Sequence, residues 1–300
     1  MIKSIHWSVL ISFFISLAAF SPSQANPADE DSGLEDSMTF HVYDDVDLVS
    51  TLKFEYGRPR IIIKSVYPQL VSETDHAGVD TFNEMALQYV KDEIALFRER
   101  VKDHAEAQKK IPKDKITNNL YIDYNTSYIK SKRDHIISIR FSIQGYVGGT
   151  AEPYHTHRVL NYNLDKNQAI ELSDLFIPGS NYLEILSRYT RFDLARRLKN
   201  SSRIADGTLP VPESFANWNI KPTGIVITFD ENRVAPDVYG AQTVLVPYSA
   251  LSEVIAPDSP VADCIAHRSR CLSNNLLTGG FIDEAANTNH GRFNPILGKL

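Results

Sequence analysis

The stretch NLYIDYNTSYIKSKRDHIISIRFSIQGY, residues 119–146, decides the fold. Two runs rich in β-branched and aromatic residues, 119–130 and 135–146, lie on either side of the polar tetrapeptide SKRD. Such runs around a short polar break are typical of a hairpin. The glycine-rich VGGTAEP follows, and a third β-forming run covers 155–164. The sequence therefore predicts an antiparallel sheet at the centre of the chain.

The segment before this sheet contains two strands and a long helix. TLKFEY at 51–56 and RIIIKSVYPQL at 60–70 are rich in β formers, with Gly57-Arg58-Pro59 as a turn between them. The period then changes, and apolar residues recur every three or four positions between charged ones. This pattern predicts one amphipathic helix over residues 80–107. Its apolar positions are Phe82, Ala86, Val90, Ile94, Phe97 and Val101.

The segment after the central sheet predicts a second, shorter amphipathic helix over 181–198, then strands at 218–220, 224–229 and 243–246. A short helix begins near Ser249. Strands occur in runs, and two helices are interposed without the regular strand–helix alternation of a parallel sheet. We therefore expect an α+β fold with antiparallel sheets, one long helix and one shorter helix.

Residues 1–25 have the pattern of a secretory signal peptide. Lys3 precedes an apolar run from Ser8 to Phe20, and Ser23-Gln24-Ala25 supplies small residues for cleavage after Ala25. The apolar run is shorter than the roughly 20 residues that span a bilayer, so a retained anchor is the weaker interpretation. We expect a periplasmic or secreted protein with no membrane insertion after cleavage.

The charge balance is mildly acidic, with 37 Asp and Glu against 31 Lys and Arg. Cleavage after Ala25 would remove Lys3 and no acid, which gives 30 − 37 = −7. This surface argues against nucleic acid or an anionic membrane as the main partner and permits a basic protein.

The two cysteines, Cys264 and Cys271, stand seven positions apart in CIAHRSRC. In an oxidising compartment two such thiols are expected to form a disulfide. Metal binding is the alternative, with His267 between them, but two thiolates and one imidazole leave a tetrahedral zinc site incomplete.

Several short motifs now resemble the extracytoplasmic RsiV/PdaC-like family, which includes the sensor part of a lysozyme-responsive anti-sigma factor and an accessory domain of peptidoglycan deacetylases. The likeness covers about residues 39–255, and five motifs occur in the family's order. They are Tyr67-Pro68-Gln69 with Asn83, Tyr146-Val147-Gly148-Gly149, Asn161-Tyr162-Asn163, Leu172-Ser173-Asp174-Leu175-Phe176, and a last set of Ile227-Thr228-Phe229, Ala235-Pro236, Gly240 and Val246-Pro247-Tyr248.

The resemblance implies a two-part domain that binds cell-wall-related ligands or proteins, and it implies no catalytic residues. We expect an acidic lead-in at 26–37, an N-terminal part at 38–145, a C-terminal part at 146–256 and a tail with the cysteine loop at 257–300. The family commonly has Gly-Gly-Ala-His-Pro, where this chain has GTAEP at 149–153, so a role of that histidine does not transfer. The residues expected to bind ligand surround this turn: Tyr146, Gly148, Gly149, Glu152, Pro153, His155 and His157.

The search for catalytic chemistry finds only partial sets. Asp230-Glu231 at the end of a strand resembles the start of a deacetylase metal site, but the nine histidines include no His-x-x-x-His pair to complete it. His155 and His157 share one face of a strand, a half-site for a metal that lacks a third ligand. The Gly148-Gly149 pair lacks the context of a phosphate loop and is better interpreted as a tight turn. We expect no metal and no cofactor.

Two functions remain. The first is a non-catalytic binding module for a lysozyme-like wall-active protein or a wall glycan; a secreted effector that binds a host protein is not separable from it by sequence. The second is a hydrolase of envelope polysaccharides or esters that uses Asp230, Glu231, His155 and His157. Convergence of these four side chains in one pocket would favour the hydrolase. The oligomeric state is open.

Overall fold

The structure is a computed structural model that describes residues 40–43, 45–58, 60–131, 134–198, 201–266 and 271. All of them lie in one of the chain's two compact units, Leu34–Leu300. The expected signal peptide, the acidic lead-in, His267 and residues 272–300 lie outside the described residues.

The larger sheet has seven strands that neighbour one another in chain order. Every pair is antiparallel except β3–β4, which is parallel. The expected α+β fold with antiparallel sheets is confirmed, and the parallel β3–β4 pair is the one departure from it among the described strands. A long helix connects β3 to β4 and returns the chain to the end where β3 began, as a parallel pair requires. The strands are β1 (Phe40–Tyr43), β2 (Val46–Gly57), β3 (Ile61–Ser72), β4 (Asn118–Lys130), β5 (His135–Tyr146), β6 (Tyr154–Asn163) and β7 (Gln168–Ala169).

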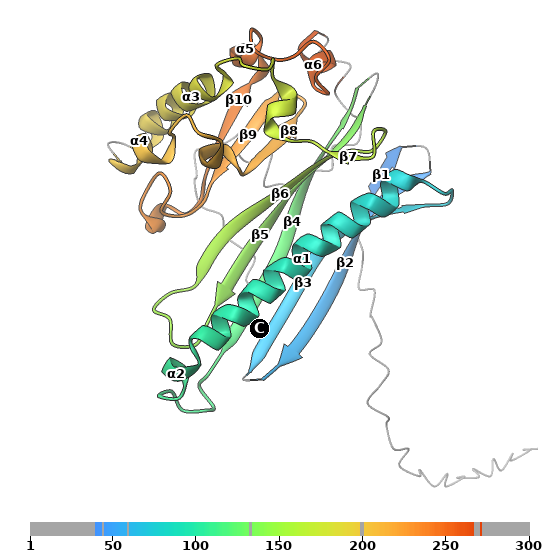
Figure 1. Ribbon diagram of the computed structural model, residues 1–300. Helices are drawn as coiled ribbons and strands as arrows, with labels where there is room; N and C mark the ends of the chain where they lie inside the picture. Colours follow the sequence, from blue (N-terminus) through green and yellow to red (C-terminus); the bar gives the residue numbers. More distant parts are fainter. Residues whose placement is uncertain are drawn as a thin grey trace, which may run out of the picture. The chain divides into compact units, whose positions relative to one another are not determined.

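The connecting helix α1 (Ala77–Asp103), followed by the short α2 (Ala105–Gln108), covers one face of this sheet (Figure 1). All six apolar positions predicted for the helix are buried, so the periodicity identified its packing face. Asn83 near the helix start donates to the Leu70 carbonyl at 2.8 Å and accepts from the Leu70 amide at 2.7 Å. Within the described residues, no helix has the length and apolar character needed to span a membrane.

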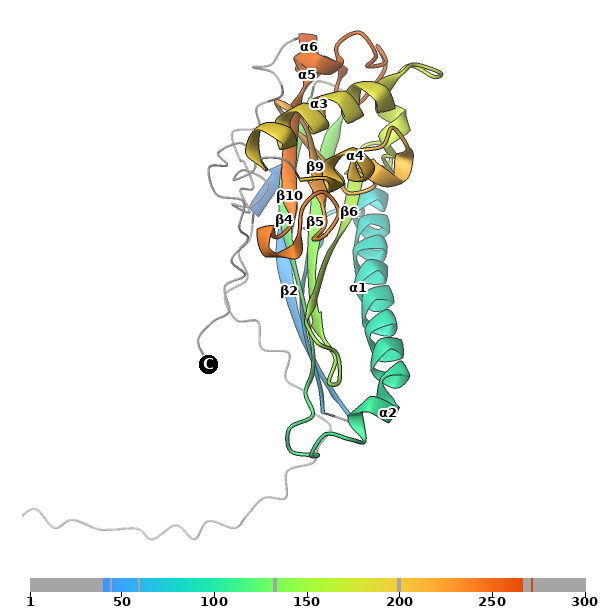
Figure 2. The ribbon, with the colours of Figure 1, turned by 90° about the vertical axis from the view of Figure 1, so that its left-hand side faces the viewer.

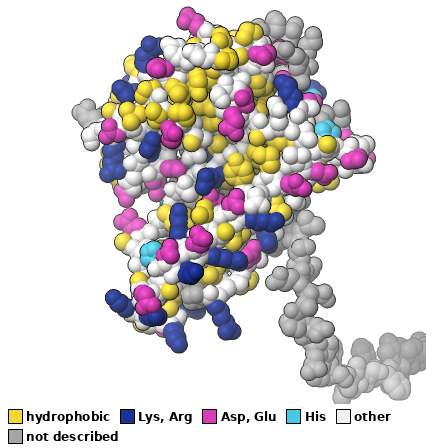
Figure 3. Space-filling view, in the orientation of Figure 1, with side chains coloured by type: hydrophobic (Ala, Val, Ile, Leu, Met, Phe, Trp, Pro, Cys, Tyr) yellow, Lys and Arg dark blue, Asp and Glu magenta, His cyan; other side chains and the backbone are white. Residues whose placement is uncertain are grey.

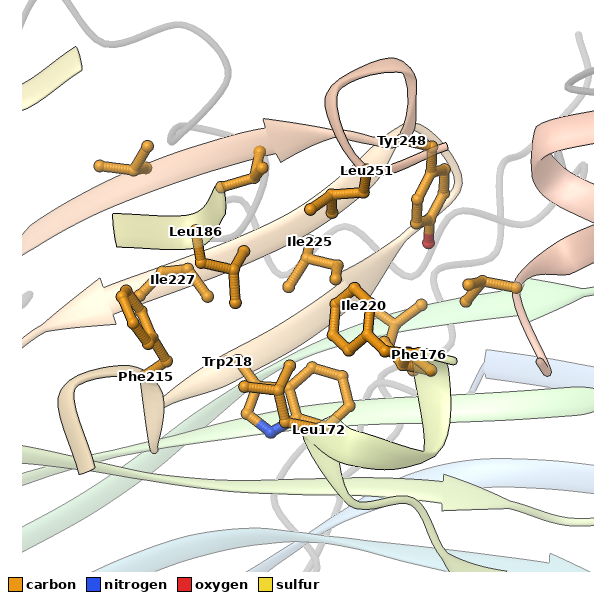
Figure 4. Packing of buried hydrophobic residues seen from close by; sticks show 14 of the residues in the cluster. Leu172, Phe176, Leu186, Phe215, Trp218, Ile220, Ile225, Ile227, Tyr248 and Leu251 are labelled. Carbon is orange, nitrogen blue, oxygen red and sulfur yellow. The ribbon is translucent and has the colours of Figure 1, made fainter. Parts of the chain in front are cut away.

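The smaller sheet has the order β10-β9-β8 and is antiparallel. Its strands are β8 (Trp218–Lys221), β9 (Gly224–Phe229) and β10 (Gln242–Pro247). Ile225 and Ile227 of β9 pack in one apolar cluster with Leu186 of α3 (Tyr182–Arg197), as Figure 4 shows. The next residue of β9, Thr228, points to the opposite side of the strand and accepts a hydrogen bond from the seven-stranded sheet. The smaller sheet therefore lies between α3 and the larger sheet.

Short elements complete the apolar cluster formed by the smaller sheet and α3, which we call the second core. They are α4 (Arg203–Gly207), α5 (Tyr248–Leu251), α6 (Ala262–Ala266) and the 3₁₀ helices η1 (Leu172–Leu175), η2 (Pro212–Phe215) and η3 (Asp237–Tyr239). The predicted Cys264–Cys271 disulfide is confirmed, and both cysteines are buried in this core. Ser259 and Val261 are buried as well, so packing extends into the first part of the expected tail. The boundary expected at 145/146 falls inside the larger sheet, because β5 pairs with β6.

One part of the larger sheet, on the face away from α1, is not covered by the described residues of the smaller sheet (Figure 2). Glu55 of β2 pairs with Arg98 of α1 at 2.6 Å, so the adjacent Phe54 and Tyr56 point to the other face. Phe54 is 47% exposed and Tyr56 is 74% exposed. The strand registers place further residues beside them on that face. We call this set the open face: Phe54, Tyr56, Ile62, Lys64, Tyr121 and Tyr146.

Candidate functional site

The contact between the two sheets is apolar around Ile129 and Ile136, and beside these residues it includes a buried polar stretch. Ser138 of β5 receives hydrogen bonds from the Asn219 side chain at 2.9 Å and from the Ile220 amide at 3.0 Å. Its own hydroxyl donates to Asn161 of β6 at 2.5 Å. All of these residues are buried, so the bonds satisfy groups that water cannot reach.

Arg140, two residues further along β5, is completely buried between the sheets. Its guanidinium donates to the Thr228 hydroxyl of β9 at 3.0 Å and to the Asn125 side chain of β4 at 3.4 Å. A guanidinium stays charged at all relevant pH values, so it must keep polar partners to be buried. Arg140 therefore links three strands and fixes the smaller sheet against the larger one.

Two histidine–carboxylate pairs lie next to Arg140 at the edge of this contact. His157 Nδ1 lies 2.6 Å from Asp230 Oδ1, and His155 Nδ1 lies 2.7 Å from Glu231 Oε1. Because a carboxylate only accepts, each imidazole donates through Nδ1. The four residues named as hydrolase candidates are therefore brought together, by β6 and the end of β9. We call them, with Arg140, the junction cluster.

The inner pair, His157 and Asp230, is largely buried, and its surroundings shift the pKa of His157. The His157 side chain is only 5% exposed, and burial is the main cause that lowers its pKa. The Asp230 hydrogen bond acts in the opposite direction, and the Arg140 charge lowers the pKa further. Asp230 also accepts from the Thr156 hydroxyl at 3.0 Å and from the Asn217 amide at 3.3 Å. His157 is thus a neutral donor in a network that joins the two sheets.

The outer pair is more accessible, with His155 31% and Glu231 24% exposed. Among the described residues, neither His155 Nε2 nor the hydroxyl of Ser142 has a hydrogen-bond partner; Ser142 faces His157 across the β5–β6 ladder. No serine–histidine hydrogen bond of the kind used in nucleophilic catalysis joins them. The described residues also contain no group of three or more His, Cys, Asp or Glu that could hold a metal ion.

The residues expected to bind ligand fall into three locations. Tyr146 lies on the open face, while His155 and His157 belong to the junction cluster. Gly148 donates its amide to Asn118 at 2.9 Å, and Gly149 has a φ of +97° that other residues rarely adopt. Both glycines thus shape the turn beside α2.

The other two expected ligand residues, Glu152 and Pro153, lie exposed in the loop that connects β5 to β6. Sequence reasoning missed Ser138, Arg140 and Asn219. A signal existed in HIISIRFSIQ, where polar residues alternate with apolar ones along a strand at the centre of the predicted sheet.

Most motif residues that carry the family resemblance have structural roles. Asn161 donates to the Trp218 carbonyl at 2.9 Å, and Tyr248 donates to the Lys221 carbonyl at 2.7 Å. Leu175 and Phe176 are buried in the second core. The motifs therefore mark the fold and do not by themselves mark a ligand site.

The buried neutral state of His157 predicts a loss of stability in mild acid. Its folded pKa lies below the unfolded value of about 6.5, so the unfolded chain binds more protons once the pH falls below that value. Stability is fully present above this pH and declines below it. His157→Asn keeps a donor for Asp230 and should show a smaller decline in unfolding free energy between about pH 7.5 and about pH 5.5.

His41→Asn is the control for this pH experiment, because the His41 side chain is 56% exposed. The unfolding free energy of this variant, measured by urea unfolding at each pH, should decline as that of the unmodified protein does. Identical pH profiles for the unmodified protein and His157→Asn would contradict the assignment.

Parts of the chain are similar to a known protein family and to two characterised proteins. A family model described as a protein of unknown function (DUF3298) matches residues 173–249. The chain is 26% identical over 141 residues to the peptidoglycan-N-acetylmuramic acid deacetylase PdaC of Bacillus subtilis, covering 46% of this chain and 29% of that protein. It is 29% identical over 103 residues to the esterase Rv3036c of Mycobacterium tuberculosis, covering 34% of this chain and 45% of that protein.

These matches span less than half the length of the two curated relatives. The crystal structure of a DUF3298 family member from Bacteroides fragilis superimposes with a TM-score of 0.51 at 14% identity, over 77% of this chain and 98% of that one. That likeness shows a shared α+β fold. The resemblance to the RsiV/PdaC-like family is therefore confirmed, and residues 173–249 of the chain match the DUF3298 domain.

Proposed function

We propose that the protein is an exported binding module that recognises a wall-active protein or a wall glycan through its open face. The observation that carries this proposal is the open face itself, a surface of partly or largely exposed aromatic side chains beside the rigid junction cluster. Exposed aromatic rings that are held on a strand lose little entropy on binding, and contiguous apolar patches on soluble proteins often mark interaction sites.

The compartment is supported by two independent features. The Cys264–Cys271 disulfide is typical of proteins outside the cytoplasm. The signal-peptide pattern in residues 1–25 predicts the same location. The similarity to a protein named as a peptidoglycan deacetylase supports a wall-related partner for this chain.

Binding is favoured over turnover by the state of the junction cluster. Asp230 already accepts three hydrogen bonds, and its partner His157 is buried. A general base must reach the proton it removes, and these groups are instead engaged in joining the sheets. The same engagement makes the cluster a rigid support for the neighbouring open face.

The proposal predicts that aromatic substitutions on the open face weaken binding. Tyr121→Ala with Tyr146→Ala should reduce retention of the mature chain on purified peptidoglycan, or on immobilised lysozyme, by about tenfold, the effect of losing two interface aromatics. Sedimentation with peptidoglycan measures the first retention, and interferometry on immobilised lysozyme measures the second.

Phe192→Ala serves as the control for this test, because Phe192 is 63% exposed on α3 and lies outside the open face. It should bind as the unmodified chain does. Failure of the unmodified chain to bind either probe, or equal losses in both variants, would argue against the proposal.

An envelope polysaccharide or ester hydrolase is the second candidate, because Asp230, Glu231, His155 and His157 do meet at one place. The similarity to a protein named as an esterase points in the same direction. In this alternative His155 would be the general base and Glu231 its orienting carboxylate, and the buried His155 Nε2 would have to become accessible to substrate.

This alternative predicts that Glu231→Gln, which keeps the size of the side chain, lowers hydrolysis at least about a hundredfold, as loss of a general base system does. Release of p-nitrophenol from its acetate ester and release of acetate from peptidoglycan measure the two reactions. Asp237→Asn, an exposed carboxylate in η3, is the control. Turnover that is absent, or equal in both variants, would eliminate the hydrolase.

A further inference from the structure

Lys and Arg side chains gather at the end of the described structure where α2 lies, although the chain as a whole is acidic. Figure 3 shows these dark blue side chains at that end. The turn between β2 and β3 and the segment 106–115 contribute six bases and two acids, which gives 6 − 2 = +4 against −6 for the whole chain. The two acids are Glu106 and Asp114. We call the bases the basic platform: Arg58, Arg60, Lys109, Lys110, Lys113 and Lys115.

Hydrogen bonds hold the backbone of the basic platform in place. Gln108 at the end of α2 donates to Asn118 of β4 at 3.0 Å, and both side chains are buried. The same Asn118 oxygen accepts the Gly148 amide at 2.9 Å. The Arg60 guanidinium donates to the Asp114 backbone carbonyl. The Asn118 backbone N–H donates to the Arg60 backbone carbonyl at 3.1 Å. These bonds join the two segments that carry the charges, so the backbone of the basic platform is fixed.

Most of the charge is not neutralised within the described residues. Lys109 pairs with Glu106 at 2.6 Å, but that pair is largely exposed and contributes little. Lys110, Lys113 and Lys115 are exposed, and no described carboxylate forms an ion pair with them. Like charges that lie within the screening length of about 8 Å at physiological salt repel one another, so a concentration of bases favours the binding of an anion. A solvated end without a ligand would usually mix both signs.

The basic platform continues into the aromatic part of the open face. Tyr56 stands two residues before Arg58 on β2 and is 74% exposed. Phe54, on the same face, is 47% exposed, and the Lys64 ammonium lies 5.8 Å from the centre of its ring. Lys64 therefore lies beside the Phe54 ring, and Arg58 follows the exposed Tyr56 closely in the sequence. This combination suits a polymer that carries both anionic groups and the apolar faces of sugar rings.

We infer that the basic platform and Tyr56 bind an anionic polysaccharide of the cell envelope. The lysines and arginines pair with its carboxylate or phosphate groups, and the aromatic rings contact its sugars. This inference deepens the proposed function and rests on it for the envelope location. The ligand inferred here is anionic, whereas a lysozyme-like partner would be basic. Nucleic acid offers a similar combination of phosphate and ring, and it becomes an outcome of the test.

The test uses the mature chain, residues 26–300, and polygalacturonate as the anionic polysaccharide, with neutral dextran as its uncharged counterpart. We expect binding to polygalacturonate that weakens about tenfold or more between low and physiological salt, because screening shortens the reach of the charges. Dextran should not bind. Interferometry with immobilised polysaccharide measures both affinities.

The variant Lys109→Gln/Lys110→Gln/Lys113→Gln/Lys115→Gln should weaken polygalacturonate binding by about tenfold or more, since it removes four charges from one site. Tyr56→Ala should weaken it severalfold at unchanged salt dependence. The matched control removes four exposed charges elsewhere, by Lys91→Gln/Lys130→Gln/Arg188→Gln/Arg196→Gln, and should leave binding unchanged.

Three results would overturn the inference: no binding of polygalacturonate by the folded chain, equal losses in the platform variant and its control, or tighter binding of oligo-dT than of polygalacturonate. The proposed function is judged separately by peptidoglycan and lysozyme retention. A chain that binds either of these but not polygalacturonate contradicts only this inference. A chain that binds polygalacturonate but neither of the other probes contradicts only the open-face proposal.

Discussion

The burial of the Arg140 guanidinium between two sheets is the constraint on which the rest of the structure depends. Moving a charge out of water costs several kcal/mol unless polar groups replace the water. Thr228 of β9 and Asn125 of β4 supply such groups, and the Ser138–Asn219 bonds continue the polar contact along β5. An apolar contact between two sheets could slide, whereas hydrogen bonds to a fixed guanidinium define one register. The smaller sheet is thereby fixed over one part of the larger sheet.

That placement also creates the surface that we propose for binding. The contact ends at His157–Asp230 and His155–Glu231, and beyond these pairs the same sheet face carries Tyr121, Tyr146, Phe54 and Tyr56. The sheet is covered by α1 on its other side, so the open face lies on a packed and rigid support. At its far end the open face meets the basic platform, which is positively charged although the net charge of the whole chain is negative. One surface therefore combines a polar edge, aromatic rings and a positive end.

Much of the fold was predictable because local patterns and tertiary packing agree. The hairpin of β4 and β5, the helix positions from Phe82 to Val101 and the strands of the smaller sheet follow from alternation and period. The parallel β3–β4 pair did not follow, because strand direction depends on how α1 returns the chain. The candidate site was predictable only in pieces. His155, His157, Asp230 and Glu231 were noted as separate motifs, but their pairing depends on the sheet contact, and nothing in the local sequence pattern showed that Arg140 is buried.

The central claim is that the partner meets the open face and not the DUF3298 core around α3. Hydrogen–deuterium exchange of the mature chain, with and without solubilised peptidoglycan fragments, tests it most directly, because each strand reports its own protection. The account predicts added protection in β2, β3 and the β4–β5 hairpin, with little change in α3 and β10. Protection confined to α3, β9 and β10 would contradict it.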